Sequence, residues 1–123
     1  MKTIVVVDDE FDLTSTLRAI LEARGYRVVT CGDGREAREC LAQQRPDLLL
    51  LDVMMPLGNG YDVLSWLRSD AELADTAVVL MNSVDPPKDR PVTWQGFLRK
   101  PLALEPLFAA VEQLIGPASG KIA

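Results

Sequence analysis

Apolar runs alternate with segments of helical spacing along the chain. Runs such as Ile4 to Val7 and Leu48 to Leu51 contain no polar position, which is typical of strands buried on both faces of a parallel sheet. The pattern predicts five strands, which are Thr3 to Asp8, Arg27 to Cys31, Asp47 to Asp52, Ala77 to Met81 and Phe97 to Arg99.

Between these runs, apolar residues recur every three or four positions, which predicts helices. The first helix carries Leu13, Leu17, Ile20 and Leu21 and ends before Gly25. The second is capped by Asp33, carries Ala37, Cys40 and Leu41, and stops at Arg45-Pro46. The third carries Tyr61, Leu64 and Leu67, and the last begins near Pro106 and ends after Ile115. Strands that alternate with helices predict an α/β fold, with a parallel sheet covered by helices on both faces.

One segment interrupts the alternation. Between the last two strands, residues 84–96 include Pro86, Pro87 and Pro91, which remove backbone donors and disfavour the α conformation in the preceding residues. At most one turn of helix fits there.

Asp52 stands where a buried apolar run changes into the turn residues Pro56, Gly58 and Gly60. The carboxyl edge of an open α/β sheet is where ligands bind, so this acid is a candidate site residue. The alternative is that Asp52 caps the next helix.

Composition narrows the function classes. The 123 residues fit one domain, 48% are hydrophobic, and the net charge of -5 disfavours a nucleic-acid surface. With no histidine, Cys31 and Cys40 do not support a zinc site, and we expect free thiols. The apolar N-terminal run is too short for a signal peptide, and no membrane segment is expected, so we predict a cytoplasmic protein.

The strand ends carry complementary charges. Asp8 and Asp9 follow the first strand, and the first and third strands are neighbours in most such sheets, so both acids should approach Asp52. Clustered carboxylates call for a hard cation such as Mg²⁺. Lys100 and Ser83 end two further strands and could bind a phosphate, although each read alone is an ordinary surface or turn residue.

Together these residues resemble the receiver domain of two-component response regulators. The matching features are Asp8-Asp9, the motif Asp52-x-x-Met55-Pro56-x-x-x-Gly60, Ser83 after an apolar strand, and Lys100-Pro101. The resemblance runs from about Thr3 to Ile115. It implies a flavodoxin-like three-layer sandwich with strand order 2-1-3-4-5. Chemotaxis receivers are known examples of this strand order. We expect a receiver domain over residues 1–117 and a flexible tail over 118–123.

The resemblance also implies a role for each acid. Asp52 would be the phosphorylation site, receiving its phosphoryl group from a sensor histidine kinase, a phosphotransfer protein or a small phosphodonor. Asp9, Asp52 and the backbone carbonyl of Met54 would bind Mg²⁺ or Mn²⁺, and Asp8 would act through a coordinated water. The protein would be a signalling switch rather than an enzyme, although it would assist its own phosphorylation and autodephosphorylation.

Further residues would read the phosphorylated state. Lys100 would pair with Asp52 and then with the phosphate, Ser83 would move to a phosphoryl oxygen, and Phe97 would be the switch aromatic. Met54 and Asp85 flank the route of water in this family, so we predict that they set the lifetime of the phosphoryl group.

The sequence departs from the family pattern after Ser83. Val84 stands where a small residue is usual, and the span to Lys100 is several residues short, so the fourth helix should be curtailed or missing. We hypothesise that residues 84–96, with an exposed Trp94, form a mobile or partner-specific surface. Output would then pass through a protein effector, from a monomer or weak dimer that is either a stand-alone domain or part of a longer regulator.

Three other protein classes are alternatives to a phosphorylated receiver. Aspartyl-phosphate hydrolases carry an Asp-x-Asp motif at the nucleophile, whereas in this chain Met54 stands where the second aspartate would be. A flavin or nucleotide module needs a glycine loop after the first strand, where Asp8, Asp9 and Glu10 would repel phosphate. A phosphorylation-independent pseudo-receiver that keeps the fold as an interaction module remains open.

Overall fold

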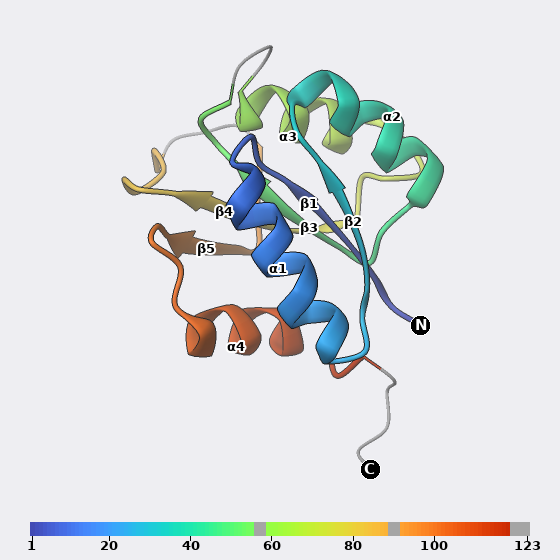
Figure 1. Cartoon of the computed structure of the whole chain (residues 1–123). Helices are drawn as coiled ribbons and strands as arrows, with labels where there is room; N and C mark the ends of the chain where they lie inside the picture. The colour runs from blue at the N-terminus through green and yellow to red at the C-terminus, as the bar shows by residue number, and fades with distance from the viewer. Residues whose placement is uncertain (56–58, 89–91, 119–123) are drawn as a thin grey trace.

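The computed structural model describes residues 1–55, 59–88 and 92–118 (Figure 1). Strands and helices alternate along them in the order β1 Thr3–Val7, α1 Phe11–Ala23, β2 Arg27–Cys31, α2 Gly34–Gln44, β3 Leu48–Asp52, α3 Gly60–Ser69, β4 Ala77–Asn82, β5 Gly96–Arg99 and α4 Leu104–Ile115. Each strand and helix expected from the sequence is present. The bounds that were predicted differ from the observed ones by one or two residues at most.

The five strands form one parallel sheet in the order β2-β1-β3-β4-β5, which confirms the flavodoxin-like topology. In the register of this sheet, Val7 at the end of β1 lies between Cys31 of β2 and Leu51 of β3. Asp52 lies beside Met81 of β4. The residues that follow β1 and end β3 are therefore neighbours at the carboxyl edge.

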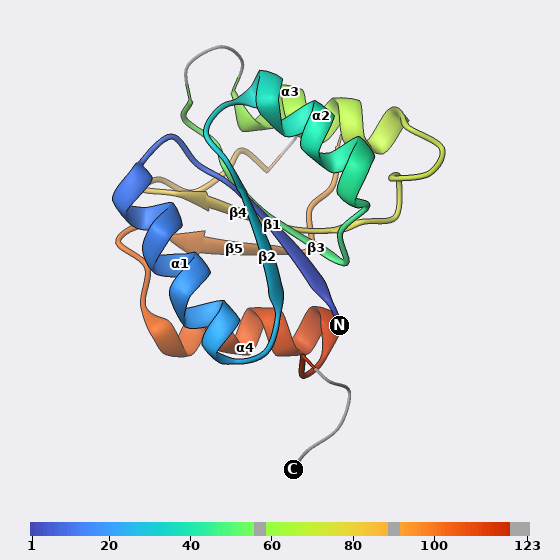
Figure 2. The same cartoon turned by 45° about the vertical axis from the view of Figure 1, so that its right-hand side comes forward.

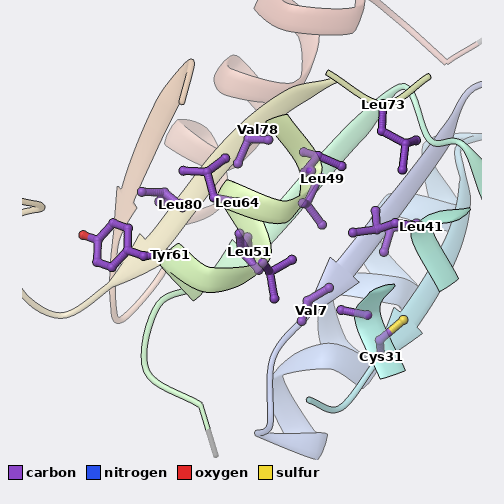
Figure 3. Close-up of a cluster of buried hydrophobic side chains, with 14 of the residues drawn as sticks. Val7, Cys31, Leu41, Leu49, Leu51, Tyr61, Leu64, Leu73, Val78 and Leu80 are labelled. Carbon is purple, nitrogen blue, oxygen red and sulfur yellow. The ribbon is translucent and has the colours of Figure 1, made fainter. Parts of the chain in front are cut away.

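Helices cover both faces of the sheet, with α1 and α4 on one side and α2 and α3 on the other (Figures 1 and 2). In β3, Leu48 and Leu50 point into the core under α1 and α4, and Leu49 and Leu51 point into the core under α2 and α3. All four leucines are fully buried. We call the second cluster the α2/α3-side core; Figure 3 shows part of it. The uninterrupted apolar run thus fills both layers at once.

The loop after β3 leads to a helix with its own cap. Asn59 caps α3, because its side-chain oxygen accepts a hydrogen bond from the backbone N–H of Asp62 at 3.1 Å. The alternative that Asp52 caps this helix is therefore wrong. The backbone N–H of Gly60 donates to the carbonyl of Val53 at 2.9 Å, which brings the start of α3 against the end of β3. Pro56 and Gly58 of the predicted motif lie outside the described residues.

The segment between β4 and β5 contains no helix in residues 83–88 and 92–95, the parts of it that the structure describes. This confirms the expected loss of the fourth helix for those residues; Pro91 lies outside them. Trp94, which we expected to be exposed, is instead half-buried and packs on the α2/α3-side core, with its ring centroid 6.2 Å from that of Tyr61. Without a helix here, the large aromatic side chain gains more by covering apolar surface than by facing water.

Arg68 at the end of α3 anchors the same segment. Its guanidinium donates to the carbonyl of Thr93 at 3.0 Å and to the side chain of Gln95 at 2.9 Å. The same group also donates to the carbonyls of Ala74 and Thr76 before β4. One side chain therefore ties the end of the irregular segment to both α3 and β4.

The end of the described chain packs back onto the molecule. The Tyr26 hydroxyl donates to the carbonyl of Gly116 at 2.7 Å. Ala118, which we assigned to the flexible tail, is only 7% exposed and joins the core under α1 and α4. The remainder of the predicted tail, 119–123, lies outside the described residues. Within the described part of the chain, no helix is both long and apolar enough to cross a membrane.

Candidate functional site

Three carboxylates meet at the carboxyl edge of the sheet, as the strand order requires. Asp8 directly follows β1, Asp9 follows it, and Asp52 is the last residue of β3. One carboxylate oxygen from each lies within 4.8 Å of the others. Asp8 is 1% exposed and Asp52 is 2% exposed, whereas Asp9 faces solvent. We call these three residues the acidic cluster.

Lys100 brings a positive charge into the acidic cluster. Its backbone N–H continues the pairing between β5 and β4 by donating to the carbonyl of Asn82 at 2.8 Å. Its ammonium donates to Asp8 Oδ2 at 2.7 Å and lies 3.3 Å from Asp52 Oδ1. A third carboxylate, that of Glu10, accepts from the same ammonium at 3.2 Å.

The charges alter the titration of both partners. Burial, followed by the charge of Asp8, raises the pKa of Asp52 to about 6, although Lys100 and a backbone hydrogen bond from Met54 act in the opposite direction. For Lys100, burial lowers the pKa, but the hydrogen bond to Asp8 and the charges of Asp52 and Asp8 outweigh it, so the pKa is raised. The ammonium therefore stays charged while Asp52 ionises near pH 6.

A pocket of about 630 Å³ opens over these groups. Its lining consists of acids, polar residues and apolar rim residues, namely Asp9, Glu10, Leu13, Asp52, Met54, Asn82, Ser83, Lys100, Pro101 and Leu102. Met54 is 69% exposed at this rim. The pocket therefore gives a small anionic group a path from solvent to Asp52 and Lys100.

Not all of the other predicted residues line this pocket. Ser83 is exposed and lines it. Asp85 forms an ion pair with Arg99 and is not among the lining residues. Arg99 also donates to the carbonyl of Ser83 at 2.9 Å. Phe97 is half-buried against the α2/α3-side core.

Two polar lining residues were not predicted from the sequence. Glu10 contacts Lys100, and its place immediately after Asp9 at the same strand end was the available signal. Asn82 precedes Ser83 at the end of β4 and is buried with a polar side chain, a combination that a β-strand pattern alone does not reveal.

The acidic cluster suits a hard divalent cation. Mg²⁺ takes oxygen ligands at about 2.0–2.1 Å in octahedral geometry, so ligand oxygens around one ion lie about 3–4 Å apart. The three carboxylates lie close enough to supply such ligands with small side-chain adjustments. The pKa of Asp52 is raised because the acid is buried and lies beside the charge of Asp8, and a bound cation would offset both effects.

Comparisons with known proteins agree with this geometry. The chain is 37% identical over 116 residues to the response regulator MprA of Mycolicibacterium vanbaalenii, covering 91% of this chain and 49% of that protein. It is 38% identical over 116 residues to the response regulator MprA of Mycobacterium ulcerans, with 91% and 49% covered. The chain thus spans about half the length of these curated relatives.

Solved structures share the fold over nearly the whole chain. The chemotaxis protein CheY4 of Vibrio cholerae superposes with a TM-score of 0.87 at 26% identity, covering 94% of this chain and 99% of that one. The signal receiver domain of a signal transduction histidine kinase from Syntrophus aciditrophicus has a TM-score of 0.84 at 31% identity, covering 98% and 92%. Residues 4–112 match the response regulator receiver domain, and the chain belongs to this family of two-component signalling domains.

Proposed function

We propose that this receiver domain accepts a phosphoryl group on Asp52 and uses it to switch its contacts with other proteins. The observation that carries the proposal is the placement of Asp52: it is buried at the end of β3, lines the pocket, and lies 3.3 Å from the ammonium of Lys100. A buried carboxylate with solvent access on one side and a cation beside it suits nucleophilic attack on phosphorus.

In the proposed reaction, a carboxylate oxygen of Asp52 attacks the phosphorus atom of the donor. The bond between phosphorus and the leaving group breaks, and the leaving group departs with the electron pair. With a pKa of about 6, Asp52 is ionised and nucleophilic at neutral pH. Lys100 stays beside the phosphorylated Asp52 and donates to a phosphoryl oxygen, which limits the charge that builds up there.

Asp9, Asp52 and the backbone carbonyl of Met54 would hold Mg²⁺ or Mn²⁺, and Asp8 would contribute through water. When bound, the ion supplies positive charge that offsets the negative charge on the phosphoryl oxygens. Asp8 is oriented for its part by two hydrogen bonds, from Lys100 and from the backbone N–H of Glu10 at 2.9 Å. Hydrogen-bonded neighbours of this kind fix the direction of a ligand carboxylate.

The proposed switch starts at Ser83. Its hydroxyl would donate to a phosphoryl oxygen, which draws the end of β4 toward Asp52 and changes the space available to Phe97. Arg99 holds the carbonyl of Ser83 and the carboxylate of Asp85, so movement of Ser83 acts on that ion pair as well. Signalling would therefore reach the surface of β5.

Met54 and Asp85 would control the lifetime of the phosphoryl group in different ways. Met54 lies at the pocket rim and would exclude water directly. Asp85 is paired with Arg99 and lies outside the lining, so its carboxylate would have to turn toward the pocket to orient or repel a water there.

The partners that follow from this function are a sensor histidine kinase or phosphotransfer protein as donor and a protein effector as receiver of the signal. The named relatives are response regulators, which supports this assignment. Residues 84–88 and 92–95 contain no helix, so effector contacts would use the segment 84–96 together with the surface of β5 and α4, in a monomer or weak dimer.

Phosphoryl uptake tests the proposal. The protein is incubated with acetyl phosphate and either Mg²⁺ or EDTA, and its intact mass is measured; a histidine kinase is used as donor in a parallel reaction. We expect one added phosphoryl group that depends on the metal and is lost on treatment with hydroxylamine, which cleaves acyl phosphates. No uptake from either donor would instead assign the chain as a phosphorylation-independent interaction module.

A further inference from the structure

β5 is the strand that brings Lys100 to the acidic cluster, and its own sequence specifies its register weakly. It has four residues, Gly96–Arg99, and begins with a glycine. It pairs with β4 alone, because it is an edge strand of the sheet (Figure 1). Short edge strands that contain glycine are prone to shift in register. Lys100 directly follows this strand, so its position depends on how β5 is paired.

Backbone hydrogen bonds flank β5 at both ends. Before the strand, the backbone N–H of Gln95 donates to the carbonyl of Val78 at 2.8 Å. After the strand, the backbone N–H of Lys100 donates to the carbonyl of Asn82 at 2.8 Å. A shift of the strand by one residue would move Lys100 by about 3.3 Å along the sheet and turn its side chain to the other face.

The side chain of Gln95 strengthens the first of these contacts. Its Oε1 accepts from the backbone N–H of Val78 at 2.8 Å, so Gln95 is joined to Val78 through both its backbone and its side chain. The same oxygen accepts from Arg68 Nη2 at 2.9 Å. Gln95 is exposed, and the charge of the guanidinium makes this bond stronger than one between neutral groups. We call the bonds of Gln95 to Val78 and Arg68 the Gln95 clamp.

Arg68 is itself held by carbonyls that precede the two strands. Its Nε donates to Thr93, before β5, at 3.0 Å. Its Nη1 donates to Ala74 at 2.8 Å and to Thr76 at 2.6 Å, both before β4. Because the planar guanidinium directs its donors rigidly, Arg68 fixes the entry of β5 relative to the entry of β4.

The clamp stands where other support for β5 is absent. The described parts of the connection between β4 and β5, residues 83–88 and 92–95, contain no helix. A helix in this connection would fix the entry of the strand by packing its apolar face on the sheet. The Gln95 clamp supplies that restraint through hydrogen bonds instead.

We propose that Gln95, held by Arg68, is a positioning residue for the phosphoryl-transfer site: it sets the register of β5 and thereby holds Lys100 against the acidic cluster. Neither Gln95 nor Arg68 lines the pocket above Asp52, so the effect passes along the paired strand. The proposal rests on the proposed function for its consequence in phosphorylation. The placement of Lys100 itself can be measured without a phosphoryl donor.

Substitutions at position 95 separate the clamp from general effects of mutation. Gln95→Met keeps the length of the side chain but removes the oxygen that accepts from Val78 and Arg68. Gln95→Glu keeps an oxygen that can accept both bonds. Gln44→Met is the matched control, because it removes another surface bond between a glutamine and an arginine, donated by Arg27 at 2.6 Å at the other edge of the sheet.

Amide hydrogen exchange, followed by NMR in EDTA, tests the placement of Lys100. In Gln95→Met, the amide of Lys100 should exchange at least about fivefold faster than in wild type, whereas amides of β1 should change by less than about twofold. Gln95→Glu and Gln44→Met should exchange as wild type does. Faster exchange confined to Val78 would overturn the proposal, because the clamp would then act only locally. Equal acceleration in β1 would also overturn it, because the effect would then be one of global stability.

Phosphoryl uptake from acetyl phosphate and Mg²⁺ tests the consequence for the reaction. Gln95→Met should react at least about threefold more slowly than wild type, and Gln95→Glu should react within about twofold of it. Equal rates in Gln95→Met and wild type, or an equal loss in Gln95→Glu, contradict the positioning role. If wild type takes up no phosphoryl group from any donor, the proposed function fails, and the exchange of the Lys100 amide still decides whether the clamp holds this residue.

Discussion

Lys100 lies closer to Asp8 than to Asp52: its ammonium donates to Asp8 Oδ2 at 2.7 Å and lies 3.3 Å from Asp52 Oδ1. Both carboxylates are buried. One lysine therefore balances two buried acids, and the acid with the looser contact is the proposed acceptor. That arrangement leaves the oxygens of Asp52 less committed to a partner, as a nucleophile requires.

Removing Lys100 should destabilise the fold. In Lys100→Met, Asp8 and Asp52 lose their shared cation, and breaking a buried ion pair costs on the order of 3 kcal/mol. The free energy of unfolding is measured with urea in EDTA. Arg18→Met is the matched control, since it removes one partner of an exposed pair, Arg18 with Glu22, and should cost under about 1 kcal/mol. Equal losses of unfolding free energy in both variants would show that the buried contacts of Lys100 stabilise the fold no more than an exposed ion pair does.

Stability should depend on pH through Asp52. Its carboxyl has a pKa of about 6 in the folded protein and about 3.9 in an unfolded chain, so the native state holds this proton more tightly. Ionisation therefore disfavours folding: the penalty is absent below about pH 4, grows up to about pH 6 and is complete above it. Asp52→Asn avoids the penalty.

Urea unfolding in EDTA checks this sign. Asp52→Asn should be more stable than wild type by on the order of 2 kcal/mol at about pH 7.5, and the difference should vanish near pH 4. Asp12→Asn, at an exposed position in the first turn of α1, is the control and should show no such trend. A stability difference for Asp52→Asn that stays constant over this pH range contradicts the raised pKa.

Glu10 should restrain Lys100. It accepts from the ammonium at 3.2 Å and adds a negative charge to the pocket lining, so Glu10→Gln should speed phosphorylation by acetyl phosphate about two- to fivefold. Asp12→Asn removes the same charge from outside the pocket lining. If the two variants accelerate the reaction equally, the effect is general charge and not the contact with Lys100. Uptake rates are read from intact mass against time.

Gly60 should be irreplaceable for steric reasons. A Cβ added there would overlap the carbonyl oxygen of Asp52 and lie 2.9 Å from the Cα of Val53, both backbone atoms that cannot move aside. We expect Gly60→Ala to lower the free energy of unfolding by about 2 kcal/mol or more. At Gly32 a Cβ would meet only the end of the Glu36 side chain at 4.0 Å, so Gly32→Ala should change the free energy of unfolding by about 0.5 kcal/mol at most. Similar losses at both positions contradict the steric account.

The fold followed from the sequence because its signals were local and agreed with one another. The run Leu48 to Leu51 predicted a strand buried on both faces, and parallel strand order then placed Asp8 near Asp52. Local patterns could not predict which acids Lys100 would contact. Its long side chain extends from the end of β5 to the end of β1, where it donates to Asp8 and Glu10. Trp94 was misjudged for a related reason, since the prolines predict the loss of a helix but not what the tryptophan covers.

The acceptor role of Asp52 is tested most directly by comparing wild type with Asp52→Asn. Both proteins are first shown to unfold cooperatively, then incubated with acetyl phosphate and Mg²⁺, and their intact masses are recorded. We predict that wild type gains one phosphoryl group and that Asp52→Asn gains none. A variant that takes up a phosphoryl group at the rate of wild type, or a wild type that takes up none from acetyl phosphate or a histidine kinase, would contradict the account.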